Sequence, residues 1–78
     1  MLTRPRFRPH LHVEVIPGEG VFVLSGPRKS LLRGRLYELI APRLNGVTVD
    51  DVCSELHGQV SPAEIFYTLN QLEAKKYL

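Results

Sequence analysis

Polar and apolar residues alternate over residues 12–16, which read His-Val-Glu-Val-Ile. Strict alternation is typical of a β-strand with one buried face. A second apolar run at 21–24 follows a Pro-Gly-Glu-Gly turn, and Ser25-Gly26-Pro27 separates it from a third short segment at 29–33. Strand-like segments separated by such turn residues predict a three-stranded antiparallel meander.

The period changes to helical spacing from Leu36 onward. Apolar residues at helical intervals predict a helix that ends before Asn45-Gly46, and Pro42 should shorten or bend it. Thr48 is the predicted N-cap of a second helix with acidic residues in its first turn. Ser61 and Glu64 form a capping box that opens a third helix over the following residues. Strands followed by helices indicate an α+β domain.

The last two predicted helices are separated by only a few residues around Gly58, which is the helix-turn-helix arrangement. The predicted fold is therefore winged helix-turn-helix-like, with a three-stranded antiparallel sheet followed by three helices. We expect residues 1–11, rich in Arg and Pro, to form an extended N-terminal arm outside the core, and residues 12–78 to form the domain. A chain of 78 residues is too short for a second domain.

Composition narrows the function to binding rather than catalysis. A domain of this size has a small core and little room for a deep catalytic pocket. The single cysteine, Cys53, excludes an internal disulfide and indicates a reducing, cytoplasmic location. No apolar run approaches the ~20 residues of a membrane span, and the N-terminus lacks the apolar core of a signal peptide.

No residues group into a recognisable catalytic or metal-binding motif. His10 and His12 are two apart and share a strand face, but a third ligand is missing. Cys53 lies in an apolar helical stripe, where a buried thiol is more common than a nucleophile. With neither a triad nor a carboxylate pair, we expect no enzyme activity, no cofactor and no metal.

The charge distribution tests a nucleic-acid hypothesis. Residues 1–39 carry seven basic and three acidic groups, whereas residues 40–78 carry three basic and five acidic groups. A recognition helix normally presents basic or amide side chains near its N-terminus, but the third predicted helix presents Glu64 there. A winged-helix DNA-binding domain is therefore the alternative function, and a membrane partner is not expected.

The third predicted strand is the edge of the meander and can accept an extended peptide by strand addition. The predicted peptide-binding residues lie on this strand and on the free face of the third helix: Lys29, Ser30, Leu31, Leu32, Arg33, Phe66, Tyr67, Asn70 and Gln71. Phe66 and Tyr67 either contact the peptide or extend the core, since a helical wheel is uncertain by a residue. The same edge could pair with a second copy of the chain to form a homodimer.

Several segments together resemble a known family: Val13-Glu14-Val15, Val21-Phe22-Val23-Leu24-Ser25, Leu31-Leu32-Arg33-Gly34, Leu44-Asn45-Gly46 and Ala63-Glu64-Ile65, with Leu69, Leu72 and Tyr77-Leu78. They resemble the PqqD-like leader-peptide recognition element of ribosomal-peptide (RiPP) biosynthesis. The variant most similar to this sequence is the N-terminal domain of ThiF-like proteins that partner YcaO-type cyclodehydratases. The similarity covers nearly the whole chain after the arm.

This resemblance implies a non-catalytic domain that binds the leader segment of a precursor peptide between its third strand and third helix. The leader would pair as an added strand and be presented to a YcaO-type cyclodehydratase that forms thiazoline or oxazoline rings, as in bacteriocin biosynthesis. Lys29 and Arg33 would attract acidic residues of the leader. Family proteins normally continue into a larger ThiF-like domain after this region.

Overall fold

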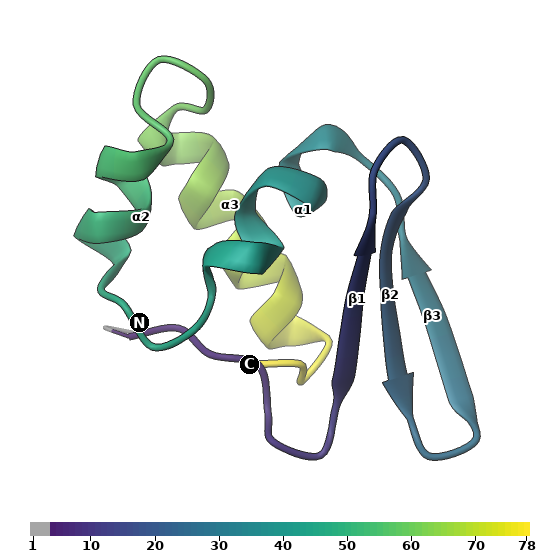
Figure 1. The fold of residues 1–78 in the computed structure, drawn as a ribbon. Coiled ribbons are helices and arrows are strands. Elements are labelled where there is room, and N and C mark those ends of the chain that lie inside the picture. The colour runs from purple at the N-terminus through teal and green to yellow at the C-terminus, as the bar shows by residue number, and fades with distance from the viewer. Residues whose placement is uncertain (1–3) are drawn as a thin grey trace.

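Three antiparallel strands form a sheet of order β1-β2-β3 in the computed structural model, which describes residues 4–78 (Figure 1). The strands are β1 (His12–Ile16), β2 (Gly20–Ser25) and β3 (Arg28–Leu32). Val13 pairs with Val23 across β1 and β2, and Val23 pairs with Ser30 across β2 and β3. The predicted meander is confirmed, and β3 is an edge of this sheet.

Three α-helices follow the sheet, namely α1 (Arg35–Ile40), α2 (Val49–Glu55) and α3 (Pro62–Ala74). The first predicted helix is shortened as expected, because α1 ends at Ile40 and a 3₁₀ turn, η1 (Ala41–Arg43), contains Pro42. Proline has no amide hydrogen for the α-helical bond and its ring clashes with the preceding turn. The α+β winged-helix order of strands and helices is confirmed.

Both predicted N-caps are present with full capping boxes. The Thr48 hydroxyl accepts a bond from the Asp51 amide at 3.1 Å, and the Asp51 carboxylate accepts one from the Thr48 amide at 3.4 Å. In α3, the Ser61 hydroxyl accepts from the Glu64 amide at 3.2 Å, and the Glu64 carboxylate accepts from the Ser61 amide at 3.0 Å. These local bonds satisfy amides that have no partner inside the helix.

The core lies between the helices and one face of the sheet. Helices α1 and α3 stand between the sheet and α2 (Figure 1). The inner face of the sheet contributes Val21, Val23 and Leu32, which are buried, while Val13 and Val15 pack against the same cluster. The helices and their connections contribute the remaining buried apolar residues: Ile40, Ala41, Leu44, Val49, Val52, Leu56, Val60, Ile65, Leu69 and Leu72.

Residues 4–11 of the predicted arm do not lie outside the core, which corrects the expectation from sequence, and residues 1–3 fall outside the described part of the chain. Pro5 is fully buried and Phe7 packs against the core cluster. The arm joins two distant segments, because Arg6 forms a β-bridge with Asn45 and the Arg8 amide donates to the Tyr77 carbonyl at 2.9 Å. It thereby ties the connection before α2 to the segment after α3.

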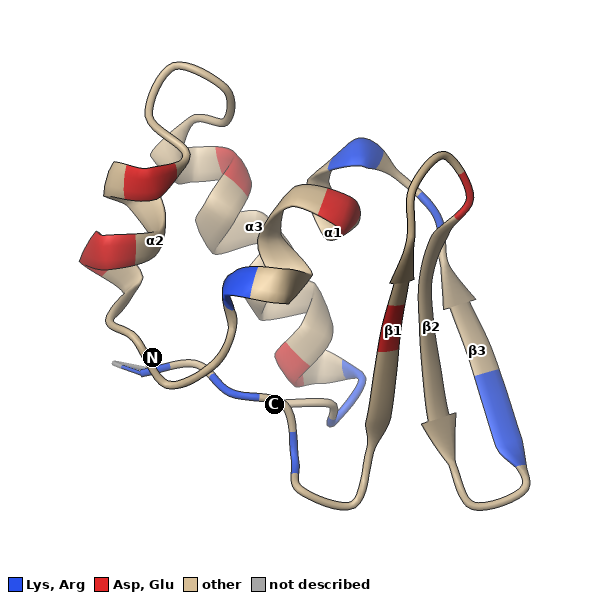
Figure 2. Ribbon diagram, in the orientation of Figure 1, with Lys and Arg blue, Asp and Glu red and all other residues tan. Residues whose placement is uncertain are grey.

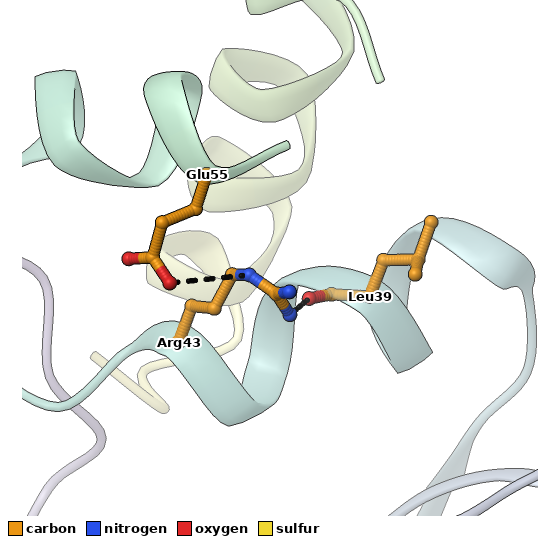
Figure 3. A network of polar contacts seen from close by, with 3 residues as sticks. All are labelled: Leu39, Arg43 and Glu55. Carbon is orange, nitrogen blue, oxygen red and sulfur yellow. Dashed lines mark hydrogen bonds and ion pairs between the residues drawn. The ribbon is translucent and has the colours of Figure 1, made fainter. Parts of the chain in front are cut away.

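Arg43 links the turn after α1 to α2 (Figure 3). Its guanidinium donates to the Leu39 carbonyl at 2.9 Å, and its Nε lies 3.7 Å from a carboxylate oxygen of Glu55. The Glu55 side chain is half-exposed, so we expect this ion pair to add at most about 1 kcal/mol to stability. It joins η1 to the end of α2.

Two further contacts hold α1 beneath the sheet. The Gly18 amide, in the β1–β2 turn, donates to the Glu38 carboxylate at 2.9 Å. At the start of α1, the Arg35 guanidinium donates to the Gln59 carbonyl at 3.1 Å. Together these bonds fix α1 between the turn and the connection before α3, which places Tyr37 near α3.

Candidate functional site

β3 is one of the two edge strands of the sheet, and β2 is its one strand partner among the described residues. In an antiparallel ladder the N–H and C=O groups of alternate residues point to the same neighbouring strand. A Cβ atom on Gly20 would lie 2.5 Å from the Leu32 carbonyl oxygen, so Leu32 directs its backbone toward β2. By alternation Ser30 and Arg28 do the same, and the N–H and C=O groups of Lys29 and Leu31 point to the open edge.

A first cleft, of about 280 Å³, lies where β3 passes into α1 and faces the first turns of α3. Leu36, Tyr37 and Tyr67 give it an apolar and aromatic wall. Its charged groups come from both sides, with Arg33 after β3 and Glu64 on α3. A cleft of this kind can accept a large apolar side chain whose backbone runs along the strand.

A second cleft, of about 320 Å³, lies at the opposite end of β3, between its inner face and the end of α3. The residues that line it include Arg28, Ser30, Lys75 and Lys76, together with His10 from the arm. This end of the site is therefore basic. It can bind a carboxylate in several positions, because Arg28, Lys75 and Lys76 carry their positive charges on flexible side chains.

Charged residues occur over the whole domain but are not evenly mixed. Figure 2 shows basic residues at the start of β3, at the end of α3 and along the arm. Acidic residues lie on α2 and in the first turn of α3, and also on β1, in the β1–β2 turn, on α1 and near the end of α3. The face beside β3 thus carries positive charge, and α2 carries Asp50, Asp51 and Glu55. A ligand with negative charge is attracted to the β3 side of the molecule and repelled from α2.

Two titratable groups of the first cleft are shifted from their ordinary behaviour. Burial raises the pKa of Tyr37, and the neighbouring hydroxyl of Tyr67 adds to this shift. The Glu64 carboxylate accepts the Ser61 amide bond of the helix cap, which lowers its pKa. Glu64 is therefore held ionised by the cap of α3, and Tyr37 remains a neutral hydroxyl at the cleft wall.

The predicted β3 residues divide between the two faces and the edge. Lys29 and Arg33 are exposed, whereas Ser30 and Leu31 are half-buried. Leu32 is only 6% exposed and belongs to the core. Its side chain lines neither of the two clefts.

The predicted α3 residues also divide, because they lie on opposite flanks of the helix. Tyr67 is 61% exposed and Gln71, one turn later, shares its flank. This flank faces the clefts, as the cleft residues Glu64 and Lys75 show. Phe66 and Asn70 lie on the other flank, and Phe66 packs against the core.

Sequence reasoning missed several cleft residues, notably Tyr37, Thr68, Arg28 and Lys75. The spacing Glu64, Thr68, Gln71 and Lys75 marks one helix flank, but the sequence does not say which flank faces β3. Thr68 is a buried polar residue, and its hydroxyl donates to the Glu64 carbonyl at 2.9 Å. It reads as an interruption of the apolar stripe and is in fact a wall of the first cleft.

The described residues hold little that suggests other chemistry. Within residues 4–78 there is no cluster of three or more His, Cys, Asp or Glu side chains suited to a metal ion. No helix in this range combines the length and apolar character that crossing a membrane requires. Burial, with a contribution from Asp50, raises the pKa of Cys53, so its thiolate is disfavoured.

Comparison with protein families supports the architecture. A family model described as "Winged Helix-turn-helix domain" matches residues 6–78. The chain belongs to this family. No curated protein sequence matches it.

Two solved structures are similar to this winged-helix domain. The first, the heterocyclase TruD, shares 36% identity with a TM-score of 0.89 over 97% of this chain. The second, a heterocyclase in complex with substrate and cofactor, shares 40% identity with a TM-score of 0.83 over 92% of this chain. The match spans 11% and 10% of those two proteins, so this chain corresponds to about a tenth of each.

Proposed function

We propose that this winged-helix domain binds the leader segment of a ribosomally synthesised precursor peptide by strand addition at β3. The observation that carries the proposal is the open edge at Lys29 and Leu31, which has a cleft against α3 at each end. An added strand would satisfy the free backbone groups, and side chains on its inner face would enter the clefts.

The similar structures support the biosynthetic setting of the proposal. Both are heterocyclases, and one contains a substrate. We propose that the domain presents the peptide to a YcaO-type cyclodehydratase that forms thiazoline or oxazoline rings. In this proposal the domain contributes recognition and leaves the chemical step to the cyclodehydratase.

The proposal is tested by fluorescence polarisation with a labelled leader peptide encoded beside this chain's own gene. We expect saturable binding that weakens only mildly when salt is raised, because backbone pairing and apolar contacts are little screened. A labelled random DNA duplex is the control. Binding to the duplex alone, lost steeply with salt, would instead identify a nucleic-acid-binding winged helix.

A pair of substitutions at one position tests strand addition directly. Leu31→Pro removes an N–H that points to the open edge, where proline is tolerated in a sheet, and should weaken leader binding at least about tenfold. Leu31→Thr keeps that N–H and should bind within about fivefold of the unsubstituted domain. Equal binding by both variants would exclude pairing at this edge. Far-ultraviolet circular dichroism checks that both remain folded.

A further inference from the structure

The sheet has an outer face that the helices leave uncovered and that reaches the same edge as the proposed binding site. Four large apolar residues lie on it, Ile16, Phe22, Leu24 and Leu31, and none belongs to the core cluster or packs against it. All four are half-buried, so they shield one another and still present surface to solvent.

The register turns this face into rows that end at β3. Phe22 pairs with Leu31, and Leu24 pairs with Lys29. A strand added at β3 would place one side chain beside Leu31 and, two residues away, another beside Lys29, because successive side chains alternate between faces. Next to the edge, the row that ends at Leu31 is apolar through Phe22 and becomes acidic only at Glu14 on β1, and the other row ends in the cation Lys29.

Lys29 is free to interact with a ligand. Within residues 4–78 the one ion pair joins Arg43 to Glu55, so Lys29 has no carboxylate partner there. Its side chain is exposed on the outer face, and the acidic residue of that face, Glu14, lies on β1 in the neighbouring row and forms no ion pair with it. A carboxylate on the neighbouring strand would be its natural complement.

The charges also favour a peptide over a second copy of this chain. β3 carries Arg28 and Lys29, Arg33 follows directly, and the strand has no acidic residue. A second copy of this edge would bring further cations and no carboxylate, so Lys29 would find no acidic complement on it. A lysine on an edge strand is a common device against self-association.

We infer that the outer face of the sheet is a second recognition surface, which selects a peptide strand with an apolar residue opposite Leu31 and an acidic residue opposite Lys29. This inference rests on the proposed function and adds to it, since the two clefts contact only the inner face of the added strand. For a strand running antiparallel to β3, as every pairing in this sheet does, the preferred order is apolar-x-acidic from the N-terminus.

A charge-reversal cycle on the labelled leader tests the inference. Lys29→Glu should weaken binding of the unchanged leader about fivefold. Leaders in which each acidic residue in turn is replaced by lysine are then measured against this variant. We expect one such leader to regain affinity within about twofold of the original pair. If no leader variant regains affinity for Lys29→Glu, the inference is overturned.

A second double-mutant cycle, with a matched control, determines which face of the added strand contacts Leu31 and Lys29. Leu31→Thr should couple, by about threefold, to an apolar leader position two residues on the N-terminal side of the one coupled to Lys29. Arg28→Glu makes the same charge change on the inner face. The leader position that couples to Arg28 should therefore lie an odd number of residues from the leader position that couples to Lys29. An odd number of residues between the leader positions coupled to Leu31 and to Lys29 would overturn the assignment of both residues to the outer face.

The outcomes separate the two proposals. Failure of the unsubstituted domain to bind the leader would overturn the proposed function and this inference together. Binding that is lost in Leu31→Pro but shows no coupling at Lys29 or Leu31 would overturn only the outer-face inference. Thermal unfolding of each variant, expected within a few degrees of the unsubstituted domain, confirms that affinity changes do not reflect loss of the fold.

Discussion

The two faces of the sheet carry similar numbers of large apolar residues but have different surroundings. On the inner face, Val21, Val23 and Leu32 are buried against α1 and α3. On the outer face, Phe22, Leu24 and Leu31 remain half-exposed, although they occupy the same strands and alternate with the buried residues. The inner face therefore stabilises the fold, and the outer face is available for recognition at little cost to stability.

The largest expected difference between the two sheet faces comes from substituting two neighbouring leucines that lie on opposite faces. Leu32→Ala should lower the free energy of unfolding by about 3 kcal/mol, because it leaves a cavity in the core. Leu31→Ala should lower it by about 1 kcal/mol or less, since the side chain is already partly hydrated. Urea denaturation measures both, and equal losses would show that the outer face is also part of the stabilising core.

A smaller effect is expected from placing a hydroxyl on each face. Val23→Thr puts a polar group into the buried inner face and should cost about 1–2 kcal/mol. At the adjacent position, Leu24→Thr leaves its hydroxyl in contact with water and should cost about 0.5–1 kcal/mol. Thermal melts of the two variants give the comparison. A greater loss for Leu24→Thr would contradict the assignment of the faces.

The smallest predicted effect concerns acid and arises at the cap of α3, away from the apolar residues of both sheet faces. The pKa of Glu64 is lowered in the folded state by its bond to the Ser61 amide. Its contribution is complete above the ordinary pKa of glutamate and is lost as pH falls through the lower folded value. Glu64→Gln should therefore reduce the loss of melting temperature between about pH 6 and pH 3. An unchanged pH profile would show that the cap does not contribute.

Most of the secondary structure could be predicted from local signals. The alternation at residues 12–16, the turns around Gly18 and Gly26, and the capping boxes at Thr48 and Ser61 each depend on residues a few positions apart. The effect of Pro42 on the first helix is local for the same reason. Such features need no knowledge of the distant chain, since the bonds that create them form within one or two turns.

The candidate site was only partly predictable. The open edge at β3 follows from the order of the strands, so the sequence could place Lys29 and Leu31 on that edge. The residues that α3 contributes could not be predicted. The sequence shows that Phe66 and Tyr67 lie on different flanks of the helix, but it does not show which flank faces the sheet. The arm was misjudged because the burial of Pro5 depends on packing with residues far along the chain.

The sequence by itself determined the order of strands and helices, the N-terminal ends of α2 and α3, and the position of β3 at an edge of the sheet. These properties depend on hydrophobic periodicity and on side chains that bond to nearby backbone. Only the tertiary structure decided which flank of α3 faces β3, that Tyr37 and Lys75 contribute to opposite ends of the site, and that Leu31 is outer while Leu32 is core. Those properties depend on how α1 and α3 pack against the sheet, where contacts join residues far apart in the chain.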